Sequence, residues 1–220
     1  MYQNQGKKVD IVHLDQDIKP STICALSDHL LGCSCDVSRE IYTIEVQSNG
    51  HFLTGKVNKF CDFTPLCDQV LSMCLSSDGH LVLAHNSGIT KIKMVDHEVK
   101  EYTIDNGGQT SSSIQAVAPL SGGVIAFTDQ AQRQVKKLES DGTVVVIAGT
   151  GEEGNNNGSG SYASFGQPMG VSTEGDNIFV TDGQIGTVKL VTTVTGTIQF
   201  LENLGKLYGA FSVHLKKKTG

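Results

Sequence analysis

Short apolar runs recur along the chain, and each is broken by a turn of polar and glycine residues. Four equivalent runs precede such a turn, at 23–26, 73–75, 116–118 and 169–171. After the turn, each unit has a nearly continuous apolar run, at 29–33, 80–84, 124–128 and 178–181. Continuous apolar runs of this length predict strands that are buried on both faces.

A third run in each unit alternates between apolar and polar residues, which predicts a half-exposed strand. These runs lie at 40–44, 89–94, 134–138 and 186–191. Hairpin turns are expected next, at Asn49-Gly50, Asp141-Gly142 and Thr195-Gly196, whereas the second unit turns through residues 96–98. A fourth, outer strand should follow each turn, for example at 143–147 and 197–200.

The units form a repeat whose second strands end at Asp36, Asn86, Asp129 and Asp182. This spacing brackets the range of about 40 to 50 residues that is typical of propeller blades. A single four-stranded sheet cannot bury its own faces, and radial stacking solves that problem. We therefore predict an all-β chain, a β-propeller segment forming one domain over residues 1–220. Its blades are expected at about 21–60, 70–106, 113–148 and 168–202, with partial strands at 8–13, from a preceding blade, and at 207–213, from a following one.

One stretch of the sequence carries a family pattern, over residues 147–191. It contains, in order, Ala148-Gly-Thr-Gly151, Gly158-Ser-Gly160, Ala163-Ser-Phe165, Pro168-Met-Gly170, Val180-Thr-Asp182 and Gly186-Thr-Val-Lys-Leu190. This order resembles an NHL repeat, although Gly183-Gln-Ile185 replaces the Asn-His-Arg-type run of that family. The resemblance implies a β-propeller that usually closes with six blades. Four whole units are then an incomplete ring, and we expect a fragment of a larger protein.

Composition and charge narrow the classes of partner. The 220 residues include 25 Gly and no Trp, which favours many tight turns. A formal net charge of −6 gives no global attraction to nucleic acid or anionic lipid. Five lysines lie in equivalent third strands, at positions 91, 93, 136, 137 and 189. We expect them on ordinary solvated strand faces, with a basic RNA-binding face as the alternative, and the basic run 216–218 as a solvated tail.

The six cysteines, at 24, 33, 35, 61, 67 and 74, all lie in the first third of the chain. Cys24 and Cys74 sit inside apolar runs, where a reduced cysteine packs as a small hydrophobic residue, and we prefer this interpretation to a disulfide framework. The sequence has no apolar run of about 18 residues and no secretory signal at its start. We expect a cytoplasmic protein without membrane contact.

Candidate chemistry in the sequence is sparse. Residues 149–154 match the spacing of a dinucleotide-binding loop, but Asn155-Asn-Asn157 cannot start the required helix and two Glu would repel phosphates. We interpret the loop as a blade-to-blade connection that binds no nucleotide. The positions expected to face the propeller axis carry no His, Asp or Glu; they are Ser21, Thr22, Ser72, Gln115 and residues 167–169. His29 and His80 are expected at strand edges, so we predict no metal, no cofactor and no catalytic residue.

A non-catalytic recognition scaffold is the function these features favour, because repeat folds hold variable loops on a stiff framework. The NHL resemblance points the same way, since such repeats capture protein targets in multidomain proteins that include tripartite-motif ubiquitin ligases. The partner should be a protein, with RNA less favoured, and the sequence does not locate its contact residues. The alternative is a propeller hydrolase or lyase, lactonase-like or amidating-lyase-like, whose metal ligands lie in missing blades. A purely structural fragment also stays open.

Overall fold

The computed structural model describes residues 12–48, 53–64, 67, 69–86, 88–103, 112–160 and 162–192, together with the backbone of 197–200. Several expected features lie outside these residues: the strands at 8–11 and 207–213, the turns at Asn49-Gly50 and Thr195-Gly196, and the basic run 216–218. The described part is built from strands and one short 3-10 turn, η1 (Ser121–Gly123), with no helix long and apolar enough to cross a bilayer.

Four antiparallel sheets, here called blades 1 to 4, make up the described structure. Blade 1 contains β2 (Thr22–Ala25), β3 (Leu30–Cys35), β4 (Glu40–Ser48) and β5 (Leu53–Asp62). Blade 2 contains β6 (Ser72–Leu75), β7 (His80–His85), β8 (Gly88–Lys93) and β9 (Val99–Thr103). Blade 3 contains β10 (Ile114–Pro119), β11 (Ile125–Asp129), β12 (Gln134–Leu138) and β13 (Val144–Ala148). Blade 4 contains β15 (Pro168–Glu174), β16 (Asn177–Asp182), β17 (Thr187–Thr192) and β18 (Thr197–Phe200).

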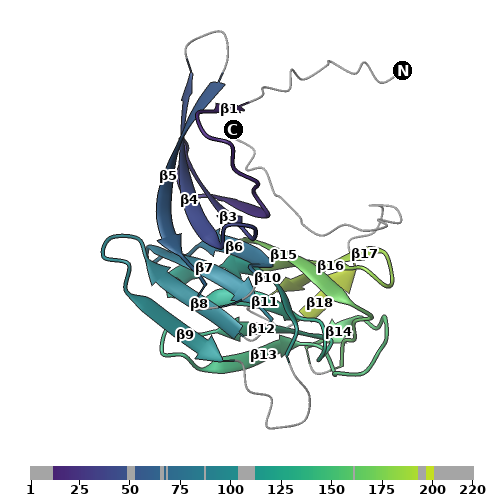
Figure 1. The fold of residues 1–220 in the computed structure, drawn as a ribbon. Helices are drawn as coiled ribbons and strands as arrows, with labels where there is room; N and C mark the ends of the chain where they lie inside the picture. Colours follow the sequence, from purple (N-terminus) through teal and green to yellow (C-terminus); the bar gives the residue numbers. More distant parts are fainter. Residues whose placement is uncertain are drawn as a thin grey trace, which may run out of the picture.

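The blades follow one another in chain order, side by side (Figure 1). The first strand of each blade contacts the first strand of the next: β2 with β6, β6 with β10, and β10 with β15. The first strands are therefore the innermost, and the later strands of each blade fan outward. Hydrogen bonds join the inner strands across the seams, for example from Thr173 Oγ1 to the Pro119 carbonyl at 2.5 Å.

Apolar side chains fill each seam between blades. Phe63 and Leu83 belong to the cluster between blades 1 and 2, Phe127 to the cluster between blades 2 and 3, and Phe165 and Val180 to the cluster between blades 3 and 4. All five are completely shielded from solvent. Burying one such side chain contributes about 1.5–3 kcal/mol, so the seams are a main source of stability. The strands β7 and β11 are buried along almost their whole length, which confirms the interpretation of the continuous apolar runs.

Two blades carry a fifth strand on their outer edge. In blade 4, β14 (Gly158–Ser159) pairs with β18. In blade 1, β1 (Val12–Leu14) runs parallel to β5. The prediction that 8–13 belongs to a preceding blade is therefore wrong for its described part. Gly55 leaves room for this pairing, because a Cβ atom there would lie 2.7 Å from Leu14 Cδ2 and 2.8 Å from Ile44 Cγ2, and these side chains would have to shift.

None of the six cysteines, all of which the structure describes, forms a disulfide bond. Cys74 lies in the seam between blades 2 and 3, and Cys33 lies in the cluster of blade 1 with Ile44 and Val57. Burial raises the pKa of the Cys24 thiol to about 12 and that of Cys33 to about 11. These thiols are protonated, packed side chains at neutral pH.

Candidate functional site

Two buried aspartates end the second strands of blades 3 and 4. Asp129 and Asp182 are 0% and 1% exposed. Each pairs with the first residue of the third strand, Asp129 with Gln134 and Asp182 with Thr187, so a hairpin of four residues follows each carboxylate. The hairpins are residues 130–133 and 183–186. Because both lie at the same end of their strands, the aspartates can hold two neighbouring loops in place.

Asp182 fixes the chain on both sides of the blade 4 entrance. Its carboxylate accepts the backbone N–H of Gly166 at 2.8 Å and of Gln167 at 2.9 Å. It also accepts the N–H of Ile185 in the following hairpin at 3.3 Å. The loop entering blade 4 and the hairpin 183–186 are therefore tied to one side chain.

Asp129 has the same role in blade 3. Its Oδ1 atom accepts the backbone N–H of Ser113, just before β10, at 3.2 Å. The same atom accepts the N–H of Gln132 in the hairpin at 3.3 Å. The hairpin is closed further by a bond from the Arg133 N–H to the Gln130 carbonyl at 3.2 Å.

A buried lysine pairs with each aspartate. Lys136 Nζ lies 2.8 Å from Asp129 Oδ2, and Lys189 Nζ lies 3.6 Å from Asp182 Oδ2. Lys189 also donates to the Ser164 carbonyl at 2.5 Å and stands 4.7 Å from the ring centroid of Phe165. Burial lowers the pKa of Lys189, against the opposing pull of Asp182. A buried carboxylate therefore neutralises the charge of each lysine inside the protein.

These contacts correct the prediction for the third-strand lysines. Lys91, Lys136 and Lys189 are 3%, 3% and 0% exposed, so they form neither a solvated strand face nor a basic surface for RNA. The physical reason is that each lysine lies two residues from a member of a cluster between blades, Ile89, Leu138 or Val191, and so shares the strand face that packs against a neighbouring blade. Lys93 and Lys137 are partly exposed and pair with Asp96 and Glu139.

The first two blades lack the carboxylate at this point. Strand registers place Cys35 and Ala84 where blades 3 and 4 have Asp, because four residues separate each from its partner, Glu40 or Ile89. The strands β3 and β7 end at Cys35 and His85, one residue before the expected ends at Asp36 and Asn86. Lys91 donates instead to the carbonyl of Gly123 in blade 3, at 2.7 Å, and lies 3.9 Å from Oδ2 of Asp78.

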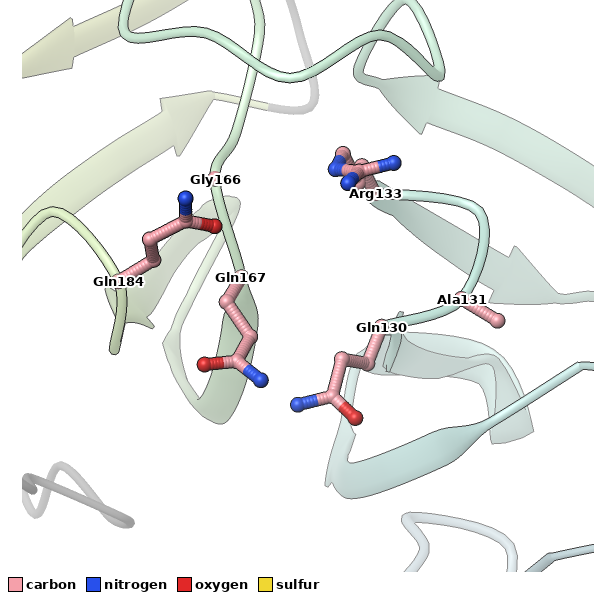
Figure 2. Close-up of a pocket in the computed structure, with 6 residues that line it drawn as sticks. All are labelled: Gln130, Ala131, Arg133, Gly166, Gln167 and Gln184. Atoms are coloured by element: carbon pink, nitrogen blue, oxygen red, sulfur yellow. The ribbon is translucent and has the colours of Figure 1, made fainter.

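A cavity of about 530 Å³ opens between the two aspartate-anchored hairpins. Its lining residues are Gln130, Ala131, Arg133, Gly166, Gln167 and Gln184. Figure 2 shows the Gln130 and Gln167 carboxamides directed toward each other from opposite walls, with Arg133 on the same wall as Gln130. The walls come from the 130–133 hairpin of blade 3 and from the entry loop and 183–186 hairpin of blade 4.

Glu153 links the two walls of this cavity. Its Oε1 atom accepts from the Gln184 carboxamide at 2.6 Å, and its Oε2 atom lies 3.4 Å from Arg133 Nη2. The Glu153 side chain remains 56% exposed. One loop carboxylate therefore occupies two donors that would otherwise be available to a ligand.

The loop that carries Glu153 is ordered by close packing of its backbone. Gly149 has φ of 107°, and a Cβ atom there would lie 2.4 Å from the Arg133 carbonyl. Further along, Glu153 forms a bridge with Phe165, and the Gly154 N–H donates to the Phe165 carbonyl at 3.3 Å. No helix begins within residues 149–160, which form turns and β14. Gly149 therefore allows the close approach of this loop to blade 3, and Gly154 allows its approach to Ser164.

Arg133 has an unusual backbone as well as a place in the cavity wall. Its φ is 50°, in the left-handed region that costs a residue with a side chain roughly 1–2 kcal/mol. Arg39, the last residue of the blade 1 hairpin, has φ of 56°. Arg133 Nε is buried and has no hydrogen-bond partner among the described residues. Arg39 thus reproduces the backbone of Arg133 at a distance from the cavity.

The positions expected to face the axis mostly make internal contacts. Thr22 bonds Ser34, the Ser72 hydroxyl accepts from the Val117 N–H, and Gln115 bonds Ser113. Of the positions expected to face the axis, Gln167 is the one that lines the cavity. His29 is exposed, whereas His80 lies 3.1 Å from Asp78. In the part of the chain that the structure describes, no three His, Cys, Asp or Glu side chains gather in a way that could hold a metal ion.

Sequence reasoning did not single out Gln130, Arg133, Gln184 or Glu153. The first three residues could have been found from their positions in the repeat. Each lies within the four residues that follow the strand-ending Asp of its repeat, and such hairpins meet at one end of neighbouring blades. Polar side chains in that window mark the loops on that end.

No family model and no curated protein matches the sequence. Solved structures do match. A streptogramin B lyase aligns with a TM-score of 0.60 and 21% identity, over 82% of this chain and 53% of that one. An auxiliary nutrient binding protein from Bacteroides ovatus aligns with a TM-score of 0.63 and 12% identity, over 84% and 47%. A catalytically inactive virginiamycin B lyase from Staphylococcus aureus, solved with quinupristin, aligns with a TM-score of 0.56 and 13% identity, over 80% and 53%.

The described structure is part of a β-propeller. The all-β prediction, with four-stranded antiparallel blades, is confirmed. The chain spans about half the length of the solved structures quoted above. At these identities the likeness establishes the fold alone, and it is shared by lyases and by nutrient-binding proteins.

Proposed function

We propose that this chain is a non-catalytic recognition module of NHL type that binds a segment of a partner protein at the cavity between blades 3 and 4. One observation carries the proposal. The cavity is lined by three glutamines, an arginine, an alanine and a glycine, and none of these residues carries a carboxylate, imidazole, thiol or hydroxyl group. Such a lining can hold a ligand but supplies no proton donor, proton acceptor or nucleophile of its own.

The chemistry of the lining favours a polypeptide ligand. A glutamine carboxamide offers two N–H donors and one carbonyl acceptor, the same groups that a peptide backbone presents. Gln130 and Gln167 face each other across the cavity, so an extended segment between them could bond to both walls (Figure 2). The NHL-like order of residues 147–191 supports the same role.

The scaffold is suited to binding without rearrangement. Asp129 and Asp182 hold the two hairpins and the entry loop through backbone N–H groups, so the walls do not depend on the ligand for their position. Preorganised walls lose less conformational entropy on binding. We therefore expect binding to leave the backbone of both hairpins where it is.

Panning a phage-displayed random dodecapeptide library on the purified chain tests this function. Enriched peptides are measured by calorimetry against three variants: Gln130→Ala, Gln167→Ala and the control Gln115→Ala. Gln115 lies in the same blade as Gln130 but outside the cavity lining. Removing one carboxamide should weaken binding by roughly three- to tenfold, the effect of one hydrogen bond, and the control should bind as the parent does.

Two kinds of result would contradict this proposed function. Failure to enrich any peptide, or peptides whose affinity ignores both cavity variants, would overturn the proposal. Stoichiometric divalent metal in the purified chain, together with hydrolysis or elimination of a lactone or cyclic depsipeptide, would favour the hydrolase or lyase alternative.

A further inference from the structure

We infer that the cavity between blades 3 and 4 recognises a carboxylate on its ligand, and that Glu153 occupies the carboxylate position while the cavity is empty. This inference rests on the proposed function and names the group recognised there. Its basis is the pair of donors, Arg133 Nη2 and Gln184 Nε2, that Glu153 engages from opposite walls.

The two donors suit a carboxylate because they converge on it from both sides. Glu153 uses one oxygen for each: Oε1 for Gln184 at 2.6 Å and Oε2 for Arg133 at 3.4 Å. A ligand carboxylate in the same position would take over both contacts. The amide and the guanidinium lose no partner in such an exchange, so the cost of leaving a donor unpaired is avoided.

Glu153 holds Arg133 weakly, which makes the exchange favourable. The Arg133 and Glu153 side chains are 36% and 56% exposed, and a pair this exposed contributes only about 0–1 kcal/mol. Its contact with Glu153 is long, at 3.4 Å, and involves Nη2. A free carboxylate can approach the guanidinium with two oxygens, an arrangement that is stronger and more directional than a single contact.

The charges around the cavity also select for an anionic group. The buried cations on either side, Lys136 and Lys189, are matched by Asp129 and Asp182. Among the described residues, the carboxylate that pairs with Arg133 is that of Glu153. Moving Glu153 away therefore leaves one net positive charge at the cavity mouth, which a carboxylate neutralises and a neutral amide does not.

The left-handed backbone of Arg133 provides a matched control for the role of its side chain. Arg39 has φ of 56° at the same hairpin position of blade 1, away from the cavity, against 50° at Arg133. Glycine occupies this position in blade 4, at Gly186 with φ of 72°, so glycine fits the hairpin.

The test titrates the ¹⁵N-labelled chain with N-acetyl-L-glutamate α-methylamide, whose one carboxylate is on the side chain, and, as a neutral match, with N-acetyl-L-glutamine α-methylamide. The parent chain should bind the acid with a dissociation constant near 1 mM, typical of a small ligand held by two or three polar contacts, and should prefer it to the amide by about fivefold or more. Glu153→Gln should tighten binding of the acid by about fivefold, because the competing carboxylate is gone. The preference should decline as salt rises, since the contact lies near the surface.

Arg133→Gly should abolish the preference for the acid, whereas Arg39→Gly should keep it. The second variant makes the same substitution at the same hairpin position and φ, in blade 1. Loss of binding in both variants would reveal a backbone effect and would overturn the role of the Arg133 side chain. Equal affinity for the acid and the amide, or no change on Glu153→Gln, would overturn the inference.

The two proposals fail separately. Peptides that bind through Gln130 and Gln167 without any acidic side chain or terminal carboxylate at the cavity would leave the recognition function standing and overturn the carboxylate inference. Shifts confined to residues outside the lining on addition of N-acetyl-L-glutamate α-methylamide would overturn it as well.

Discussion

Asp182 and Lys189 face each other from adjacent strands, with Oδ2 and Nζ 3.6 Å apart and both side chains fully shielded from solvent. Asp129 and Lys136 repeat the arrangement one blade earlier, at 2.8 Å. In both cases the carboxylate also holds the hairpin that lines the cavity. The pairs therefore connect the stability of the seam to the geometry of the candidate site.

Replacing Asp182 by alanine should destabilise the protein strongly. The change leaves Lys189 buried without its counter-charge and frees three backbone N–H groups, so we expect a loss of about 3–5 kcal/mol in the free energy of unfolding. Urea denaturation followed by circular dichroism measures it. Glu174→Ala, at the exposed end of β15, is the control and should cost less than about 0.5 kcal/mol.

A double variant separates the ion pair from the backbone contacts. Asp182→Ala combined with Lys189→Met removes both charges but leaves the N–H groups of Gly166, Gln167 and Ile185 unpaired. It should be more stable than Asp182→Ala alone by about 1–3 kcal/mol, while remaining less stable than the parent. If the second substitution brought a further loss, the buried lysine would not be the source of the cost.

Gly149→Ala should destabilise the protein through both backbone strain and a steric clash, and Gly122→Ala, which has the strain without the clash, separates the two effects. At Gly149 a Cβ atom meets the Arg133 carbonyl at 2.4 Å in addition to a φ of 107°. At Gly122 the φ is 68° and nothing lies within 4 Å of the added atom. Gly122→Ala should therefore lose about 1 kcal/mol from strain alone, and Gly149→Ala more than about 2 kcal/mol. Thermal denaturation of both variants would show the order, and equal losses would contradict the backbone clash.

The fold could be predicted well because a strand that is buried on both faces needs a nearly continuous run of apolar residues, which is easy to recognise in the sequence. The apolar run at 80–84 became β7 (His80–His85), and the alternating run at 134–138 matches β12. The turn at Asp141-Gly142 is also confirmed, with φ of 92° at Gly142. In each case local composition and tertiary packing demand the same residues.

The lysines show where this reasoning fails. Lys136 and Lys137 are adjacent in an alternating strand, and sequence pattern alone treats both as polar surface residues. Packing of blade against blade places Lys136 inside, where Asp129, seven residues earlier, accepts its charge. Asp182 and Lys189 repeat the same separation, which is a signal that the sequence does contain. The cavity could not be predicted, because it depends on which loops of neighbouring blades lie side by side.

Alkaline pH should destabilise the protein through its buried thiols. Burial raises the pKa of Cys24 to about 12 and those of Cys33 and Cys61 to about 11, from 9.0 in the unfolded chain. A native pKa above the unfolded one means that the native state holds protons more tightly. The stability from these groups is complete below pH 9.0 and is lost as pH rises through about 11 to 12.

Unfolding by urea between pH 8 and pH 11 under reducing conditions measures this loss. The variant Cys24→Val removes one of the titrating groups and keeps an apolar side chain, so its stability should fall less steeply above pH 9.0 than that of the parent. Parallel curves for the two proteins would show that Cys24 does not contribute to the pH dependence.

The two left-handed arginines should both show a near balance of strain and contact. Arg39→Gly relieves a strain of roughly 1–2 kcal/mol, against an entropy cost of about 0.5–1 kcal/mol for glycine in the unfolded chain and the loss of the attraction to Asp62. Arg133→Gly gains the same relief and loses the contact with Glu153. Each variant should therefore change the free energy of unfolding by less than about 0.5 kcal/mol. If Arg133→Gly were instead destabilised by more than about 2 kcal/mol, the arginine would be a structural part of the seam, and its strained backbone would need no explanation from ligand binding.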